Sequence, residues 1–205
     1  EAFVRCPIRA TMDVVQVGTV EGEVPVYFDR FASEADHVVV AGRIKPHTGF
    51  VGEIESGLHK MMLIGLGKHK GAALYHQAIV QYSFDRIIRG VAQQVIDKCG
   101  ILFGLAMVEN QYDETAMIEA VAPERFAERE KELLVLAKKW MPRLPFDRVD
   151  LLVIDAMGKN ISGSGMDTNV VGRKYNDHAA AEKEFPKVTR ILVRGLTPET
   201  HGNAA

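Results

Sequence analysis

The sequence predicts an α/β fold in which a largely parallel sheet is flanked by helices. Two short apolar runs, HVVVAG at 37–42 and DLLVID at 150–155, have the character of buried strands and alternate with segments of helical periodicity such as 85–98. A glycine-rich loop follows each run, and ligands of parallel sheets bind beyond the carboxyl ends of the strands. We therefore expect a Rossmann-like sheet in two lobes, with the functional site between them.

The elements of the first half follow from local patterns. Alternating segments at 14–20 and 24–29 predict two strands joined by a turn at Glu21-Gly22, and Asp29 can cap a short helix over 30–35. Ser56 can cap a helix that runs through Lys60 to about Ile64. Helices are also expected over 72–81 and 85–98, the second closed by Gly100.

The second half continues the alternation. ILFGLAMVEN and TAMIEAVA predict a hairpin around QYDE, and Pro123 opens an amphipathic helix that reaches about Trp140. RILVRGL is the last predicted strand, and Thr197-Pro198 has the pattern of a helix start. Because the sequence ends soon after this helix start and begins in the middle of a pattern, we expect the chain to be a piece of a longer protein.

The composition limits the function classes. A net charge of −2 over 205 residues gives no electrostatic footprint for nucleic acid. No apolar run is long enough for a transmembrane helix, so no membrane partner is expected. Cys6 and Cys99 fit no metal or redox spacing, which favours free buried thiols and a cytoplasmic location.

The segment from Gly42 to His76 concentrates the groups that carry chemistry. It holds four histidines, five lysine or arginine side chains and several glycines directly after a predicted strand. Within it, GLGKHKG lacks the order of a phosphate loop, and it could be either an anion-binding turn or a solvated basic turn. Taken alone, His47 could be a general acid/base or a packing residue, Lys60 functional or a surface lysine, and His76 a metal ligand or a buried histidine.

A second glycine-rich loop, GKNISGSGMD, follows the strand at 150–155. Its polar side chains and the downstream Arg173 and Lys174 could contact a carboxylate, although a plain crossover loop and surface cations fit the spacing equally.

Three motifs together resemble the lactate racemase-like family: PHTGFVGEIESGLHKMMLIGLGKHKGA, GKNISGSGMDTNVVGR and LTPETHGNA. The resemblance covers nearly the whole chain. It implies that 1–122 is part of a lactate racemase-like N-terminal domain and that 123–205 begins a C-terminal α/β domain. It further implies an isomerase, a racemase or epimerase of a 2-hydroxy acid that uses proton-coupled hydride transfer to and from a lysine-tethered nickel-pincer nucleotide.

The resemblance also implies residue roles. Lys60 would be the catalytic tether, and His76, which lies 16 residues later as in the family pattern, would be the nickel ligand. His47 would be one of two catalytic acid/base histidines, the other belonging to an earlier segment. The cofactor would also contact Ser56, Gly57, Lys68 and Lys70, and the substrate would contact Arg173 and Lys159.

Two departures from the family pattern change what it implies. Glu53 to Leu58 lengthens the interval between His47 and Lys60, and NVVGR stands after Asp167 where the family has a YQxxK pattern. The substrate is therefore expected to differ from lactate. Alternatives are another hydride-transfer or metal-dependent reaction in the superfamily, or a non-catalytic module that binds a nucleotide or carboxylate. Expected partners are a small 2-hydroxy acid, cofactor biosynthesis enzymes and a second copy in a homo-oligomer.

Overall fold

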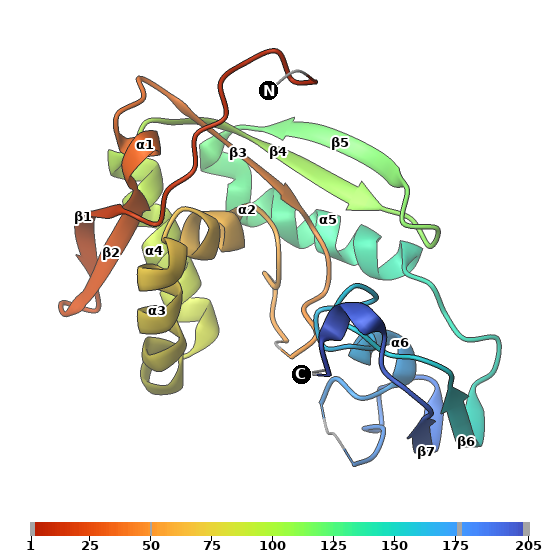
Figure 1. The fold of residues 1–205 in the computed structure, drawn as a ribbon. Helices are drawn as coiled ribbons and strands as arrows, with labels where there is room; N and C mark the ends of the chain where they lie inside the picture. The colour runs from red at the N-terminus through yellow and green to blue at the C-terminus, as the bar shows by residue number, and fades with distance from the viewer. Residues whose placement is uncertain (1–2, 50, 176–177, 203–205) are drawn as a thin grey trace. The chain divides into compact units, whose positions relative to one another are not determined.

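The computed structural model describes residues 3–49, 51–175 and 178–202 (Figure 1). It has mixed α/β architecture, which confirms the predicted class. The chain forms two compact units: the first comprises Glu1–Lys45, Gly52–Val108 and Thr115–Leu136, and the second comprises Pro46–Val51, Glu109–Glu114 and Ala137–Ala205.

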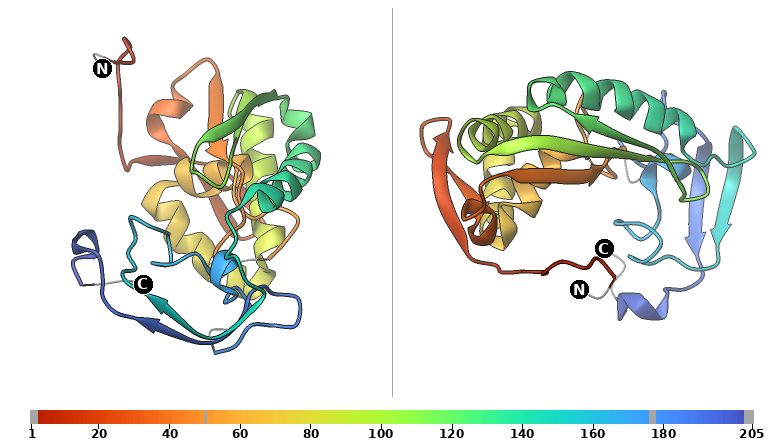
Figure 2. Two further views of the ribbon diagram at one scale, coloured as in Figure 1. Left: turned by 90° about the vertical axis from the view of Figure 1, so that its right-hand side faces the viewer. Right: turned by 90° about the horizontal axis from the view of Figure 1, so that it is seen from above.

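The first unit begins with a hairpin. Strands β1 (Val14–Val20) and β2 (Val24–Asp29) pair antiparallel, and Glu21 and Gly22 both have positive φ in the turn between them. Helix α1 (Arg30–Ser33) is capped by Asp29, whose carboxylate accepts from the Ala32 amide at 2.8 Å, as the sequence predicts. Helices α3 (Lys68–Tyr82) and α4 (Phe84–Lys98) pack side by side on the hairpin (Figure 2).

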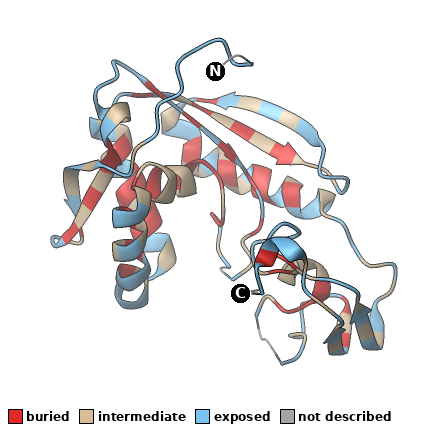
Figure 3. Cartoon of the chain, in the orientation of Figure 1, coloured by how far each residue is buried: buried red, intermediate tan, exposed pale blue. Residues whose placement is uncertain are grey.

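A three-stranded sheet forms the rest of the first unit. Strand β3 (Val38–Arg43) runs parallel to β4 (Ile101–Glu109), which neighbours β5 (Thr115–Val121). A 3₁₀ turn (Pro123–Arg125) leads into α5 (Phe126–Trp140), which runs along the sheet (Figure 2). Buried and exposed positions alternate along β3: Val38 and Val40 are buried, whereas Val39 is 43% exposed. Figure 3 shows the burial of all elements. The parallel strand predicted at 37–42 is therefore present, but it is buried on one face only.

Between β3 and α3 the chain makes a helical segment that differs from the prediction. Helix α2 spans only Leu58–Lys60, and a π-helix over Met61–Gly65 continues it, with the Leu66 amide donating to the Met61 carbonyl at 2.8 Å. The N-cap residue is Gly57, not Ser56, and no side chain caps the helix. The predicted Ser56 cap is therefore wrong, although a helix through Lys60 is present.

The second unit contains the parallel strands β6 (Arg148–Ile154) and β7 (Lys187–Val193). Helix α6 (Thr168–Val171) is capped by Asp167, which accepts from the Asn169 amide at 2.8 Å, and a 3₁₀ turn spans Pro198–Thr200. Leu151 and Val153 are about half exposed, with exposures of 51% and 49%. The run at 150–155 is thus a strand, as predicted, but it is not buried.

The strands of the described chain form three small sheets: an antiparallel β1–β2 pair, the β3–β4–β5 sheet and a parallel β6–β7 pair. One glycine-rich loop follows β3 and the other follows β6. Each of these strands belongs to a parallel pair, β3–β4 and β6–β7. Cys6 and Cys99 are free thiols as expected, but Cys6 is exposed. No helix in the described ranges has the length and apolar character needed to cross a bilayer.

Candidate functional site

Lys60 lies where the end of β3 meets α2. The Lys45 amide donates to the Ser56 carbonyl at 3.2 Å, which ties the chain after β3 to the residues that precede the helix. Gly57 permits this approach: a Cβ there would lie 2.3 Å from the Ile44 side chain and 2.0 Å from Glu130 Oε1. The local fold therefore fixes the backbone of Lys60 against the carboxyl end of a parallel strand.

The Lys60 side chain is half-buried and has no ion pair with any residue that the structure describes. Burial lowers the pKa of its amine below the usual lysine value, and the nearby positive charge of Lys45 lowers the pKa further. A lysine with a lowered pKa is neutral for a larger fraction of the time and is a better nucleophile. The surroundings of Lys60 thus favour the neutral, nucleophilic form of its amine more than those of an exposed lysine do.

The carboxylates of this region have other partners. Glu53 pairs with Arg89 at 3.1 Å and with Lys131 at 2.5 Å, and Lys131 holds the pKa of that carboxyl below its usual range. Glu55 is buried, with the Gly52 amide 3.5 Å from its carboxylate. Consequently no acid in this group neutralises Lys60.

Next to Lys60, His59 forms a buried pair with Glu130 of α5. Both side chains are almost fully buried, and Glu130 Oε2 contacts His59 Nδ1 and accepts from the His59 amide at 3.2 Å. The ring of Phe126 meets His59 edge-on at 6.5 Å between centroids. Among the described side chains, Glu130 Oε1 is buried without a hydrogen-bond partner. The pair holds α2 against α5 and thereby limits the movement of Lys60.

Glu130 is not among the predicted site residues, yet its position in the sequence carries a signal. Glu130 stands in the apolar stripe of α5, between Phe126 and Leu133–Leu134, which are buried. An acid on the buried face of an amphipathic helix needs a partner, and such a position could have been picked out from its spacing alone.

The predicted cofactor residues Lys68 and Lys70 lie at the start of α3. Lys68 has a φ of 54° and pairs with Asp29 at 3.1 Å, and Lys70 is exposed with its amine 4.4 Å from the centroid of the Tyr27 ring. Both lysines therefore contact strand β2. Ser56 and Gly57 lie at the start of α2 beside Lys60. A phosphate-binding role for these four residues stays a prediction.

His76, the predicted nickel ligand, is exposed on α3. Helix α3 packs against the π-helix that follows Lys60, so both residues belong to adjoining elements of the first unit. The described residues contain no group of three or more histidine, cysteine or acidic side chains arranged to hold a metal. A metal at His76 would therefore need further donors from a bound group.

In the second unit, His47 is held by backbone and by α6. Its Nδ1 accepts from the Gly49 amide at 3.0 Å, so the proton of the neutral ring lies on Nε2. Its carbonyl accepts from Asn169 Nδ2 at 3.3 Å, and the next carbonyl, that of Thr48, accepts from the Thr168 hydroxyl at 2.6 Å. The loop that carries His47 is therefore ordered by the start of α6.

The predicted substrate residues occupy different surroundings in the second unit. Arg173 is buried, and its guanidinium donates to the carbonyls of Gly172 at 3.0 Å and Val188 at 2.7 Å. Lys159 is exposed on the glycine-rich loop after β6. Arg173 thus braces β7 in this conformation, and the assignment of either residue to substrate stays a prediction.

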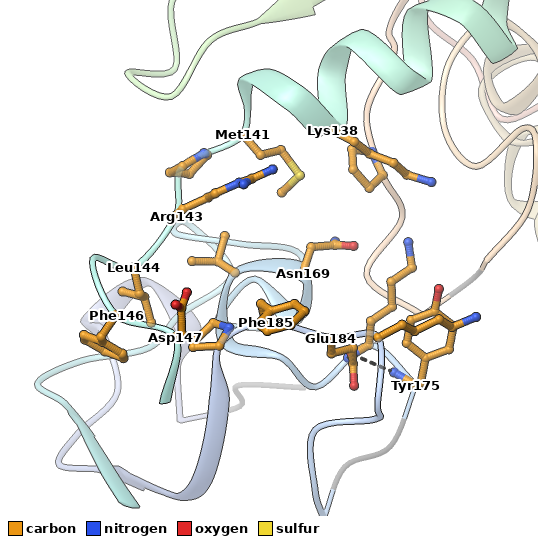
Figure 4. A pocket seen from close by; sticks show the side chains of 16 residues that line it. Lys138, Met141, Arg143, Leu144, Phe146, Asp147, Asn169, Tyr175, Glu184 and Phe185 are labelled. Atoms are coloured by element: carbon orange, nitrogen blue, oxygen red, sulfur yellow. Dashed lines mark hydrogen bonds between the residues drawn. The ribbon is translucent and has the colours of Figure 1, made fainter. Parts of the chain in front are cut away.

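The second unit also contains a cavity of about 570 Å³ (Figure 4). Its acids are Asp147 and Glu184, and Glu184 accepts hydrogen bonds from the amides of Lys174, Tyr175 and Ala181. Its lining is rich in cations, which sequence analysis did not group because they are scattered along the chain: Lys138, Arg143, Lys174 and Lys183. The excess of positive charge suits a small anion such as a carboxylate.

The fold and the site define an α/β protein with a half-buried, unpaired lysine at the end of a parallel strand. Residues 3–85 match the family model described as lactate racemase N-terminal domain. The match confirms the predicted resemblance to a lactate racemase-like family over this part of the chain, which includes Lys45, Lys60 and His76. No curated protein matches the chain.

Proposed function

We propose that the chain belongs to a racemase or epimerase of a 2-hydroxy acid in which Lys60 is the attachment point of a nickel-pincer nucleotide. One observation carries the proposal: the family match includes a lysine that is half-buried, without an acidic partner and lowered in pKa. A structural surface lysine needs none of these properties, whereas an amine that forms a covalent bond benefits from each of them.

The side chains of the first unit have the chemistry that a nickel-pincer nucleotide needs. Lys60 offers an amine, His76 offers an exposed imidazole, and nickel accepts imidazole nitrogen as a ligand. Because a pincer supplies several donors itself, a single protein histidine is sufficient, which agrees with the lack of a larger ligand cluster among the described residues. Lys68 and Lys70 add positive charge for a nucleotide phosphate.

When bound, the nickel-pincer nucleotide supplies a reversible acceptor for the hydride on the substrate carbon. Lys60 would hold the group in place through its amine. His47 would exchange a proton with the substrate hydroxyl, and in the present conformation its ring holds a proton at Nε2 for donation. The cationic cavity of the second unit supports a role in binding the substrate carboxylate.

The test is cofactor loading of a Lys60→Arg variant. The full-length protein is produced together with the enzymes that make the pincer cofactor, and its intact mass, nickel content and racemisation of a panel of 2-hydroxy acids are measured. We expect a mass increment on the Lys60 peptide and about one nickel per chain, both lost in Lys60→Arg because arginine cannot form the tether.

Lys98→Arg is the matched control, since Lys98 is exposed on α4 and its amine donates to Gln94 of the same helix. His76→Ala should keep the mass increment and lose nickel. If Lys60→Arg retains both the increment and racemisation, the tether assignment is wrong. If an unmodified wild-type chain binds nucleotide or carboxylate without turnover, the chain is a binding module.

A further inference from the structure

We infer that the cavity of the second unit takes a 2-hydroxy acid that carries a second anionic group, and that Arg143 and Lys183 bind its two anionic ends. The use of this ligand as a substrate rests on the function proposed above. Its binding does not, because the cavity is built from the protein alone and can be measured without the cofactor.

The cavity adjoins the loop that carries His47. Pro46, the residue before His47, lines the cavity, and so does Asn169. The Asn169 amide group donates to the His47 carbonyl at 3.3 Å and to the Asp167 carboxylate at 3.0 Å, so two contacts fix its side chain. A ligand in the cavity therefore lies beside the loop of the predicted acid/base histidine.

The charges of the cavity favour a ligand with two negative charges. Its described lining holds four cations and two acids, which leaves an excess of two positive charges. One of the acids, Glu184, is buried, and its carboxylate accepts from the backbone amides of Lys174, Tyr175 and Ala181 at 2.6, 3.2 and 2.7 Å. These amides stabilise its charge within the wall of the cavity. A monocarboxylate would neutralise only half of the excess.

Arg143 supplies one of these charges from the segment after α5. Pro142 and Pro145 flank the Arg143-Leu144 pair, and their rings fix the backbone at both sides of it. Arg143 has no ion pair with any residue that the structure describes. A guanidinium in this situation can donate two parallel hydrogen bonds to a ligand carboxylate or phosphate.

Lys183 supplies a second charge from another wall. Its ammonium lies 4.5 Å from the centroid of the Tyr175 ring. This cation–π contact holds the amine in place without cancelling its charge. Figure 4 shows Arg143 and Tyr175 at opposite sides of the cavity, with Asn169 between them. The two cations are therefore placed for a ligand with an anionic group at each end.

The size and the remaining lining fit a carbon chain between the two anionic groups. The cavity volume of about 570 Å³ lies within the range of about 300–1,000 Å³ that is typical of small-molecule sites, which leaves room for more than a three-carbon acid. Apolar side chains complete the walls, among them Met141, Leu144, Phe146 and Phe185. They can cover the methylene groups of a longer substrate.

The experiment compares acids that differ only in the second anionic group. Isothermal titration calorimetry on the cofactor-free protein measures the Kd of malate against 2-hydroxybutyrate, and of 2-hydroxyglutarate against 2-hydroxyvalerate, so that each diacid has a monoacid of equal chain length. We expect each diacid to bind about tenfold more tightly than its monoacid, the effect of one further charge-assisted hydrogen bond. Trp140, the single tryptophan, precedes the cavity residue Met141, so its fluorescence gives a second readout.

Variants assign the effect to the two cations. In Arg143→Gln and in Lys183→Gln one anionic end loses its partner, and the preference for the diacid should fall to about twofold or less. Arg148→Gln is the matched control, because Arg148 is an exposed cation at the start of β6 that does not line the cavity. It should keep the preference of the wild type. An additional titration with 3-phosphoglycerate, whose second anionic group is a phosphate, identifies which anion the cavity prefers.

Equal affinities for diacids and monoacids in the wild type would overturn the inference, as would the absence of binding of all these acids. A preference that survives both Arg143→Gln and Lys183→Gln would also overturn it. Tight binding of diacids to a protein that fails to load the cofactor would count against the proposed function alone. Normal loading with no preference for a second anionic group would count against this inference alone.

Discussion

At the scale of the residue, Lys60 has a charge that its surroundings disfavour. Half-burial removes water from the ammonium, and Lys45 repels it. Residues of this kind cost stability in their charged form, and folded proteins retain them mainly where the group has chemistry to perform. The charged form of Lys60 therefore lowers the stability of the fold, whereas the proposed function depends on having an amine at this position.

The opposition predicts a pH dependence of stability. Because the pKa of Lys60 is lower in the folded chain than its usual 10.5, the unfolded chain binds the proton more tightly, and the contribution of Lys60 to the free energy of unfolding rises as pH rises toward 10.5. Lys60→Met should therefore be more stable than the wild type at pH 7, and the difference should shrink by pH 10. Urea unfolding followed by circular dichroism at several pH values measures the free energy of unfolding of the wild type and of Lys60→Met. A difference that does not change with pH would contradict the prediction.

At the scale of elements, the His59–Glu130 pair connects α2 to α5 across 71 residues of sequence. A long-range buried contact of this kind fixes a three-residue helix that has no capping side chain of its own. The position of Lys60 thus depends on α5 as much as on its own segment.

Breaking this connection should destabilise the first unit. In Glu130→Ala, the buried His59 ring and amide lose their acceptor, which we expect to cost about 3 kcal/mol of unfolding free energy. The control is Glu128→Ala, an exposed position of the same helix whose partner is Arg125, where a change within about 0.5 kcal/mol is expected. Equal effects of the two substitutions in chemical denaturation would show that the buried pair does not hold α2.

The packing of β4 against the same helices gives a second prediction at this scale. A Cβ on Gly104 would lie 2.5 Å from Leu58 Cδ1 and 2.9 Å from the Phe126 ring. Gly104→Ala should therefore cost about 1–3 kcal/mol through overpacking. Gly65→Ala, whose new methyl would meet Met61 only at 3.5 Å or more, should be neutral or slightly stabilising in the same thermal unfolding experiment. A large loss of stability in Gly65→Ala and none in Gly104→Ala would contradict this account of the packing.

Several elements could be predicted because their signals are local. Asp29 caps α1, the apolar spacing of Ile87, Ile88, Val91 and Val95 marks the buried face of α4, and Pro123 precedes α5, all as expected. The burial of 37–42 and 150–155 could not be predicted, because it depends on which faces other elements cover. Likewise the Ser56 cap failed because the chain turns at Gly57, which is the residue that tolerates the contact with Ile44 and Glu130.

For the site, sequence patterns selected Lys60 and His76 through resemblance and could not supply their surroundings. The neighbours that matter, Lys45 and Glu130, lie 15 residues before and 70 residues after Lys60, and only the fold brings them to it. The roles of His47, Arg173 and Lys159 stay predictions, as does the family domain division into 1–122 and 123–205.

At the scale of the whole molecule, the chain crosses between its two units several times. Residues Pro46–Val51 and Glu109–Glu114 leave the first unit and return to it, and the main chain leaves after Leu136. The first unit therefore contains every contact of Lys60 described above, whereas His47 and the cationic cavity belong to the second.

This division predicts that a chain ending at Leu136 retains the fold of the first unit. We expect the 1–136 fragment to be soluble and to show cooperative thermal unfolding by circular dichroism. A fragment ending before α5, at Val121, should lose both properties because Glu130 and Phe126 are missing. If the 1–136 fragment has no cooperative transition, the second unit is needed for the first to fold.

The π-helix at Met61–Gly65 limits how this region can change in length. A π-turn holds one residue more than an α-turn, and each residue of a regular helix turns the chain by about 100°. Deleting a single residue between Met61 and Gly65 would convert the segment toward an ordinary helix and rotate Lys60 away from its present direction relative to Leu66. Natural or engineered variants of this chain should therefore accept substitutions in the segment far more readily than deletions, because a deletion there would change the direction of Lys60 relative to α3.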